Sequence, residues 1–306
     1  MKKVFAIVGP TASGKTSVGI ELAEILNAEI ISADSRQVYK GIGIASASPT
    51  KSEMRGIRHH FISEISPETD FNAGEFAKLA RERINTLLSN GKNALIVGGS
   101  GLYIKALIDG FFEAEIDAPE IRKTLYERME KEGKPALFEE LQDVDPESAR
   151  TMDSTKFRRV IRALEVFHST GIKISELQKS NDKPDFATIQ AGLLWDRKEL
   201  YHRINSRVDK MLSDGLIGEI KALLEQNYHY STNKSLNTVG VKEVMKYLED
   251  SYTYDEMVTQ IKQNSRRYAK RQMTWFRKDK RINWVDINSD FYPKIVAENI
   301  HKIYFS

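Results

Sequence analysis

The amino-acid sequence predicts an α/β fold in which a parallel sheet is flanked by helices and interrupted by a mainly helical insertion. Three observations lead to this prediction. Short apolar runs alternate with helical patterns in the first third of the chain, a glycine-containing turn joins the first run to the first helix, and a strongly charged segment without strand patterns follows. Continuous apolar runs are typical of parallel strands, because helices cover both faces of such a sheet.

The expected strands and helices follow one another in the order that a parallel sheet requires. Residues 4–8 form an uninterrupted apolar run, and Val18, Leu22 and Leu26 keep helical spacing after the turn. Alternation of strand and helix places neighbouring strands parallel. The full expectation is strands at 4–8, 29–32, 94–97 and 189–195, helices after residue 16 and at 76–88, and helices over most of the chain from the last strand to 278.

The chain divides into a core and an insertion. Residues 113–187 are strongly charged, helical in pattern and punctuated by Gly-Lys-Pro and Asp-Pro. We therefore predict a first part of the core at 1–112, a helical insertion domain at 113–187 and a mostly helical continuation of the core at 188–306.

Charge is unevenly distributed along the chain. The 306 residues carry a net charge of +3, whereas residues 266–281 contain eight basic residues and a single acidic one. The rest of the chain is therefore mildly acidic. A local basic stretch on an acidic body favours a polyanionic partner, and the phosphate backbone of a nucleic acid is the leading candidate.

Composition excludes several classes of protein. No apolar run approaches the ~20 residues that span a bilayer, so no membrane partner is expected. The chain has no cysteine, which excludes disulfides, thiolate zinc sites, iron–sulfur clusters and cysteine nucleophiles. A reducing, cytoplasmic location is expected, and the expected state is a monomer.

Residues 9–16 match the phosphate-loop pattern G-x-x-x-x-G-K-[ST] between a buried strand and a helix. The glycines let successive N–H groups point at one phosphate, and the helix N-terminus adds a positive dipole end. Lys15 supplies a mobile positive charge, and the Thr16 hydroxyl is a candidate ligand of Mg²⁺. The pattern predicts a P-loop NTPase-like core with phosphate or diphosphate binding by Gly9, Pro10, Thr11, Ala12, Ser13, Gly14, Lys15 and Thr16.

The loop alone leaves the reaction open. In a kinase it holds ATP or another nucleotide while the terminal phosphoryl group moves, and in another enzyme it holds a diphosphate that departs. The strand at 94–97 ends in Gly98-Gly99 without an aspartate, so the usual nucleotide-hydrolysing arrangement is not supported. Asp34 follows the strand at 29–32, at the sheet edge where ligands bind, and is either a functional carboxylate or a helix N-cap.

Seven sequence segments spread over nearly the whole chain form a set. They are GPTASGKT at 9–16, DSRQVY at 34–39, HHF at 59–61, VGGSGLY at 97–103, RALEVF at 162–167, RINSRVDKMLSDG at 203–215 and YAKRQMTWFR at 268–277. The set resembles the bacterial tRNA dimethylallyltransferases, also called tRNA isopentenyltransferases. GPTASGK together with DSRQVY and KRQMTWFR is a far more specific signal than a phosphate loop alone.

The resemblance implies an activity and a donor. Members of that family transfer a dimethylallyl group from its diphosphate to N6 of adenosine 37, beside the anticodon of tRNA, and release pyrophosphate. The phosphate loop is then implied to hold dimethylallyl diphosphate, with Mg²⁺ on Thr16, and Asp34 is implied to be the base that takes the proton of the amine. By the same resemblance Thr11 lies close to the substrates, and Lys15 stabilises the charge that grows on pyrophosphate.

The resemblance also implies contacts with the tRNA anticodon stem-loop. Asp34, Ser35, Arg36 and Gln37 would grip the extruded adenosine, and Ser100 keeps the hydroxyl of the threonine found in many relatives. The other implied contacts are Arg122, Arg158, Arg159 and Arg162 in the insertion and Arg266, Arg267, Lys270, Arg271 and Arg277 in the basic stretch. For the insertion arginines the alternative is a solvated helical face.

Two residue pairs have a second interpretation. Arg203 and Arg207 lie four residues apart on an expected helix, so both point either at the diphosphate or at nearby acids. His59 and His60 are predicted to be structural rather than metal ligands, because adjacent residues of an extended segment point to opposite faces and no third His lies near them in sequence.

The C-terminal basic stretch also contains a heptad-spaced set of large side chains. Ile261, Tyr268 and Trp275 recur every seven residues, and we interpret them as a stripe facing the core rather than as a platform for stacking bases. The chain departs from the family pattern at 41–49 and at 239–241, which leaves the substrate contacts of those segments open.

Overall fold

A computed structural model describes residues 2–110, 118–179, 183–288 and 290–305. The chain forms two compact units, of which the first combines residues 1–108 with 184–306 and the second comprises 109–183. The predicted boundary between 112 and 113 lies outside the described residues. The predicted end of the insertion at 187 falls inside a core strand that already begins at Phe186, whose side chain is buried with the core. The core therefore resumes before that predicted boundary.

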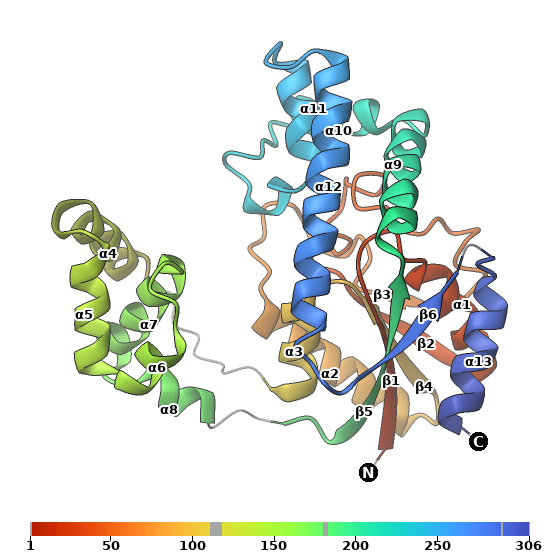
Figure 1. Ribbon diagram of the computed structural model, residues 1–306, viewed down its shortest axis with the longest axis horizontal. Coiled ribbons are helices and arrows are strands. Elements are labelled where there is room, and N and C mark those ends of the chain that lie inside the picture. The colour runs from red at the N-terminus through yellow and green to blue at the C-terminus, as the bar shows by residue number, and fades with distance from the viewer. Residues whose placement is uncertain (1, 111–117, 180–182, 289, 306) are drawn as a thin grey trace. The chain divides into compact units, whose positions relative to one another are not determined.

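The first unit is built on a six-stranded sheet (Figure 1). The strand order is β3-β2-β4-β1-β5-β6, and each neighbouring pair is parallel. The strands are β1 (Lys2–Val8), β2 (Ala28–Ala33), β3 (His59–His60), β4 (Asn93–Gly98), β5 (Phe186–Trp195) and β6 (Ile282–Ile287). The α/β fold class with a parallel sheet is confirmed, and all four expected strands are present.

Helices of the first unit fill the connections between these strands. They are α1 (Lys15–Leu26), α2 (Ala73–Ser89), α3 (Gly101–Asp109), α9 (Arg197–Ser213), α10 (Leu216–Glu225), a short 3₁₀ turn (Lys234–Leu236), α11 (Val241–Leu248), α12 (Tyr254–Phe276) and α13 (Pro293–Phe305). None of the helices within the described ranges combines the length and the apolar sequence that crossing a membrane requires.

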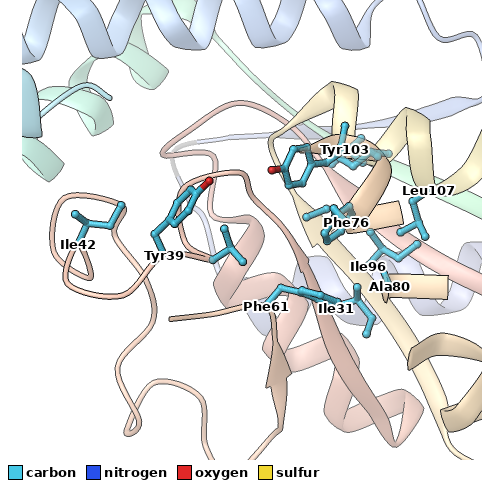
Figure 2. Close-up of a cluster of buried hydrophobic side chains, with 14 of the residues drawn as sticks. Ile31, Tyr39, Ile42, Phe61, Phe76, Ala80, Ile96, Tyr103 and Leu107 are labelled. Carbon is cyan, nitrogen blue, oxygen red and sulfur yellow. The ribbon is translucent and has the colours of Figure 1, made fainter. Parts of the chain in front are cut away.

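Alternation along the strands divides the core of this unit into two layers. Val4 and Ala6 of β1 pack in the layer that contains α2 and α3, whereas Phe5 and Ile7 pack in the layer that contains α1 and α13. Figure 2 shows the first layer, where the ring of Phe76 from α2 stacks on Tyr103 from α3 at 4.7 Å between centroids. Both faces of the central strands are covered, which explains why their sequences are apolar without interruption.

β6 and the two-residue β3 are the strands that the sequence analysis did not predict, and β6 is the longer of the two. It pairs with β5 at the sheet edge, from Gln190 opposite Ile282 to Trp195 opposite Ile287. Only the first and last residues of β6 are buried. An edge strand of this kind lacks the continuous apolar run that marks the central strands, because one of its long sides has no neighbour.

The insertion is helical, as predicted. Its helices are α4 (Pro119–Glu132), α5 (Lys134–Val144), α6 (Pro146–Thr151), α7 (Phe157–Thr170) and α8 (Ile174–Lys179). They enclose a hydrophobic core of their own, which includes Leu125, Leu141, Val160 and Leu164. The buried carboxylate of Asp145 accepts hydrogen bonds from the backbone N–H groups of Ser148 and Ser175, so it joins α6 to α8.

Candidate functional site

The phosphate loop at 9–16 leaves the carboxyl end of β1 and enters α1, as the sequence predicts. Three of its residues have left-handed backbone angles: φ is 151° at Gly9, 62° at Ala12 and 85° at Gly14. Glycine is required at position 14 for a second reason, because a Cβ there would clash with the ring of Phe291. The curled loop brings the N-terminus of α1, with its positive dipole end, to the carboxyl edge of the sheet.

Lys15 is a partly buried cation at the start of α1. Its Nζ donates a hydrogen bond to the carbonyl of Pro10 at 2.6 Å. Burial lowers the pKa of Lys15 from 10.5 to about 7, the charge of Asp34 acts in the opposite direction, and the charge of Arg207 lowers it further. An arriving diphosphate would offset the cost of desolvation, so this amine is suited to hold its proton against a bound anion.

Asp34 and the phosphate loop line one cavity of about 440 Å³. Asp34 follows β2, and its Oδ1 accepts hydrogen bonds from the backbone N–H groups of Arg36 at 2.9 Å and Gln37 at 3.4 Å. Its Oδ2 has no hydrogen-bond partner within the described residues. In the described segment 2–110 a turn and not a helix follows Asp34, so its interpretation as a helix N-cap is wrong. Oδ1 caps a turn instead, while Oδ2 is available to a ligand.

Two arginines of α9 reach the phosphate loop. Arg207 is partly buried and donates to the Thr11 hydroxyl at 3.2 Å, and Arg203 donates through Nε to the carbonyl of Ala12 at 2.9 Å. The guanidinium of Arg203 also lies over the rings of Trp195 and Phe291, at 4.3 and 5.0 Å from their centroids. In the part of the chain that the structure describes, neither arginine forms an ion pair, so the alternative of pairing with nearby acids does not apply.

The donor atoms of the cavity fit a hard cation. The Thr16 hydroxyl and the Asp34 carboxylate both line it, and both supply the oxygen ligands that Mg²⁺ prefers. Among the described residues no group of three or more His, Asp or Glu side chains is arranged to hold a metal. A Mg²⁺ ion held by these two groups would need phosphate oxygens and waters to complete its shell.

Gln272 of α12 joins the phosphate loop to the end of β4, and sequence reasoning missed it. Its Oε1 accepts from the backbone N–H of Thr11 at 2.8 Å, and its Nε2 donates to the carbonyl of Gly99 at 2.8 Å. The side chain is buried at the wall of the cavity. The only sequence signal was a single amide inside the basic motif at 268–277, which pattern reasoning assigned to tRNA contacts as a whole.

We expect Gln272→Leu to lower the free energy of unfolding by about 2 kcal/mol, because it leaves the Thr11 N–H and the Gly99 carbonyl without partners in a buried place. Urea denaturation measures this change. Gln226→Leu is the matched control, since Gln226 is exposed just after α10 and its side-chain amide donates to the carbonyl of Ala222 in that helix; its effect should stay within about 0.5 kcal/mol. Equal stability of wild type and Gln272→Leu would contradict the bridging role.

The residues implied to grip the adenosine lie together beside Asp34. The buried Ser100 hydroxyl accepts from the backbone N–H of Ser35 at 2.9 Å and donates to its hydroxyl at 3.2 Å. Arg36 donates to the carbonyl of Ser235 at 2.7 Å, and Gln37 donates to the carbonyl of Ala47 at 3.2 Å. Arg36 and Gln37 thus tie neighbouring loops to the cavity, a role that the sequence did not predict.

The segment at 41–49, which departs from the family pattern, is held by a partly buried carboxylate. Glu219 of α10 accepts hydrogen bonds from the backbone N–H groups of Ile44 at 2.7 Å and Ala45 at 2.8 Å. Burial raises the pKa of Glu219, and the backbone hydrogen bonds oppose this shift. The segment therefore has a defined position at the cavity, where Ala45, Ser46 and Ala47 form part of the wall.

The two histidines differ in their surroundings. His60 is buried, contacts Glu29 through Nε2 at 2.7 Å and lies 3.0 Å from the Arg83 guanidinium through Nδ1, which is the structural role predicted for it. His59 lies within hydrogen-bonding distance of the Ile57 carbonyl through Nδ1, at 3.0 Å. Because a carbonyl only accepts, Nδ1 carries the proton and Nε2 of a neutral ring is an acceptor. This Nε2 is buried without a partner in the described structure, and the residue lines the cavity.

Comparison with known proteins identifies the family. A family model described as IPP transferase matches residues 37–279, which is more than half of the chain. The chain belongs to this family. A tRNA dimethylallyltransferase of Salinibacter ruber is 46% identical over 281 residues, covering 92% of this chain and 87% of the relative. A tRNA dimethylallyltransferase of Bacillus subtilis is 42% identical over 286 residues, covering 93% of this chain and 90% of the relative.

Solved structures of IPP transferases share the fold. The full-length tRNA isopentenylpyrophosphate transferase of Bacillus halodurans superimposes with a TM-score of 0.72 at 37% identity, covering 99% of this chain and 96% of that one. A eukaryotic dimethylallyltransferase acting on tRNA gives a TM-score of 0.79 at 29% identity, covering 94% of this chain and 74% of that one. The family resemblance stated from the sequence is thus confirmed.

The insertion arginines of this IPP transferase fall into two groups. Arg122 and Arg162 pair with the buried carboxylate of Glu165, at 2.6 and 3.1 Å, so they neutralise a charge inside the insertion. Arg158 and Arg159 are exposed on α7. Because they are exposed, Arg158 and Arg159 are accessible to RNA phosphates. In this structure they lie on a solvated helical face, which is the alternative stated for them from the sequence.

Most basic residues of the C-terminal stretch are exposed on or just after α12. Arg266 is partly buried and donates to the side-chain oxygen of Asn205 at 2.6 Å. The exposed residues are Arg267, Lys270, Arg271, Arg277, Lys278, Lys280 and Arg281. The predicted core-facing stripe is only partly correct: Ile261 is buried and Tyr268 is partly buried at the cavity, whereas 37% of Trp275 is exposed.

Proposed function

We propose that this IPP transferase moves a dimethylallyl group from dimethylallyl diphosphate to N6 of adenosine 37 in tRNA and releases pyrophosphate. The observation that carries the proposal is one cavity lined by Lys15 of the phosphate loop and by the Asp34 carboxylate. The first is suited to a diphosphate, and the second to the proton of an amine. Relatives more than 40% identical over most of the chain bear the name tRNA dimethylallyltransferase.

In the proposed reaction, Asp34 acts on the adenosine amine and the phosphate loop acts on the diphosphate. N6 of adenosine forms a bond to the first carbon of the dimethylallyl group, the bond from that carbon to the diphosphate oxygen breaks, and Asp34 takes a proton from N6. The lone pair of an exocyclic adenine amine is delocalised into the ring, so removal of the proton as the bond forms is worth about 10²–10⁴ in rate. In this scheme Asp34 acts through Oδ2, because Oδ1 holds the turn.

The departing pyrophosphate stays on the loop. Lys15 and the N-terminus of α1 stabilise its charge, and Arg207 adds a partly buried positive charge beside the Thr11 hydroxyl. Mg²⁺ held by Thr16, and by Asp34 where that carboxylate is not engaged with the amine, would supply further charge neutralisation on the phosphates. These are the roles we propose for the residues of the phosphate loop.

The RNA side of the proposal rests on the basic exterior. A base inside the anticodon stack is out of reach of a buried cavity, so the adenosine must be extruded into it. The exposed arginines and lysines of α12 and the exposed Arg158 and Arg159 of α7 provide charges for the RNA backbone. A small-molecule kinase would need neither, and β4 ends in glycine where a nucleotide-hydrolysing enzyme usually carries an acid.

A transfer assay with purified protein, Mg²⁺, radiolabelled dimethylallyl diphosphate and unmodified tRNA tests the proposal. We expect label in the tRNA at the adenosine beside the anticodon, and none in a tRNA that carries guanosine at that position. A parallel reaction with ATP and small acceptors should show no phosphoryl transfer. Phosphoryl transfer without label in tRNA would overturn the proposal in favour of a kinase.

A further inference from the structure

Trp275 is an exposed aromatic residue held in a fixed place. It lies near the C-terminal end of α12, and its five-membered ring packs so closely on Gly101, the first residue of α3, that a Cβ at this glycine would clash with it. Nevertheless 37% of Trp275 remains exposed, as does 48% of the neighbouring apolar residue Leu102. Packing therefore fixes one part of the indole and leaves another part open.

The two segments that hold this indole are tied to the residues of the cavity. Ser100, directly before Gly101, bonds to Ser35 beside Asp34. On α12, Arg271 and Gln272 line the cavity and lie one turn before Trp275. Trp275 itself is not among the lining residues, and it lies one helical turn beyond the part of the wall that Arg271 and Gln272 form.

The surface around Trp275 is basic. Arg271, Arg277 and Lys278 lie within four residues of it on α12 or at its end, and all three are exposed. The single acid of the stretch 266–281, Asp279, is paired with Arg281 at 2.7 Å. An open aromatic face among unneutralised cations is the arrangement by which proteins bind single-stranded nucleic acid: the cations take the phosphates and the ring takes a base.

We propose that Trp275 stacks on a base of the tRNA that neighbours the extruded adenosine. This inference rests on the proposed function and deepens it. Extruding one nucleotide breaks the stacking of the bases on either side, and an indole just outside the cavity replaces one lost partner. Trp275 is then a positioning residue, which favours the open form of the anticodon loop and takes no part in the proton transfer.

The test separates stacking from simple packing by comparing two variants at Trp275. Trp275→Leu keeps an apolar cover on Gly101 but has no aromatic face, whereas Trp275→Phe keeps one. In transfer assays with an anticodon stem-loop, we expect Trp275→Leu to raise KM for the RNA by about 5- to 150-fold, the range that base–aromatic stacking supplies. KM for dimethylallyl diphosphate should stay unchanged, and Trp275→Phe should recover most of the RNA affinity.

Tyr292→Ala is the matched control, because Tyr292 is an aromatic residue with 63% exposure outside the basic stretch; it should leave both KM values unchanged. Binding of the stem-loop without donor should also quench the tryptophan fluorescence of wild type but not that of Trp275→Phe, since Trp195 is buried and Trp284 partly buried. The quench is measured without turnover, so it tests stacking even if the proposed transfer reaction fails. An unchanged KM in Trp275→Leu, equal losses in Leu and Phe variants, or a quench that persists in Trp275→Phe would overturn the inference.

Discussion

Asp34→Asn is expected to lower the rate of dimethylallyl transfer by about 10²–10⁴, the range for loss of a general base. The asparagine oxygen can still accept the backbone hydrogen bonds from Arg36 and Gln37 that Oδ1 accepts in the wild type. The turn after β2 should therefore persist, and KM for RNA should change little. What the amide cannot do is take the proton from N6, so the loss should appear in kcat.

Single-turnover rates at saturating tRNA and donor measure this loss without interference from product release. Asp255→Asn is a suitable control, because Asp255 is an exposed carboxylate in the first turn of α12 and does not line the cavity. Its rate should equal that of the wild type. An Asp34→Asn enzyme within threefold of wild type would show that another group, or the solvent, takes the proton.

Lys15 should make the binding of the diphosphate depend on pH. Its pKa in the free protein is lowered to about 7 by burial, and two negative phosphates would raise it in the complex. Above pH 7 the complex therefore holds more protons than the free protein. By linkage, the Kd for dimethylallyl diphosphate should rise with pH above 7, by at most about tenfold per unit, until the pKa of the complex is reached.

Lys15→Met should remove this slope and weaken binding below pH 7 by about 10- to 150-fold, the range for hydrogen bonds to a charged group. Calorimetric titrations of both proteins at several pH values measure the difference, and any slope from titration of the ligand itself remains in the variant. The variant should also be more stable than the wild type near neutral pH. The pKa of Lys15 is lower in the folded state than in the unfolded state, so folding near neutral pH costs free energy: the amine must either stay charged where water is excluded or give up its proton. This cost decreases as the pH rises toward 10.5, because the unfolded state then loses the same proton. Identical slopes in the two proteins would refute the assignment.

The predictions that succeeded depend on local patterns. The phosphate loop needs left-handed backbone at Gly9 and Gly14 and a lysine at a set spacing, all within eight residues. Strands covered on both faces, such as β1 and β4, can be recognised in the sequence by their uninterrupted apolar runs. Asp34 was placed beside the loop because the carboxyl ends of parallel strands meet at one edge of the sheet. Each of these inferences needs only neighbours in sequence and one topological rule.

The predictions that failed depend on partners far along the chain. β6 is a strand because β5 offers it an edge. Trp275 is partly exposed although it keeps the heptad spacing of Ile261. At this end of α12 the adjacent Phe276 is the residue that enters the core layer of Ile261, while the indole lies against the first residue of α3. Likewise, no pattern reveals whether Arg203 and Arg207 meet acids or the phosphate loop.

The sequence by itself therefore determined the phosphate loop, the position of Asp34, the helical character of the insertion and, through ordered motifs, the family. The tertiary structure alone decided how that site is held together. Gln272 bonds to Thr11 across 261 positions of the chain, and Arg207 reaches the same residue across 196. Such contacts form only when the packed core brings α9 and α12 to the carboxyl edge of the sheet. Closing such long loops costs conformational entropy, and the free energy gained by burying the whole core offsets it. No local sequence pattern shows which distant residues this burial brings together.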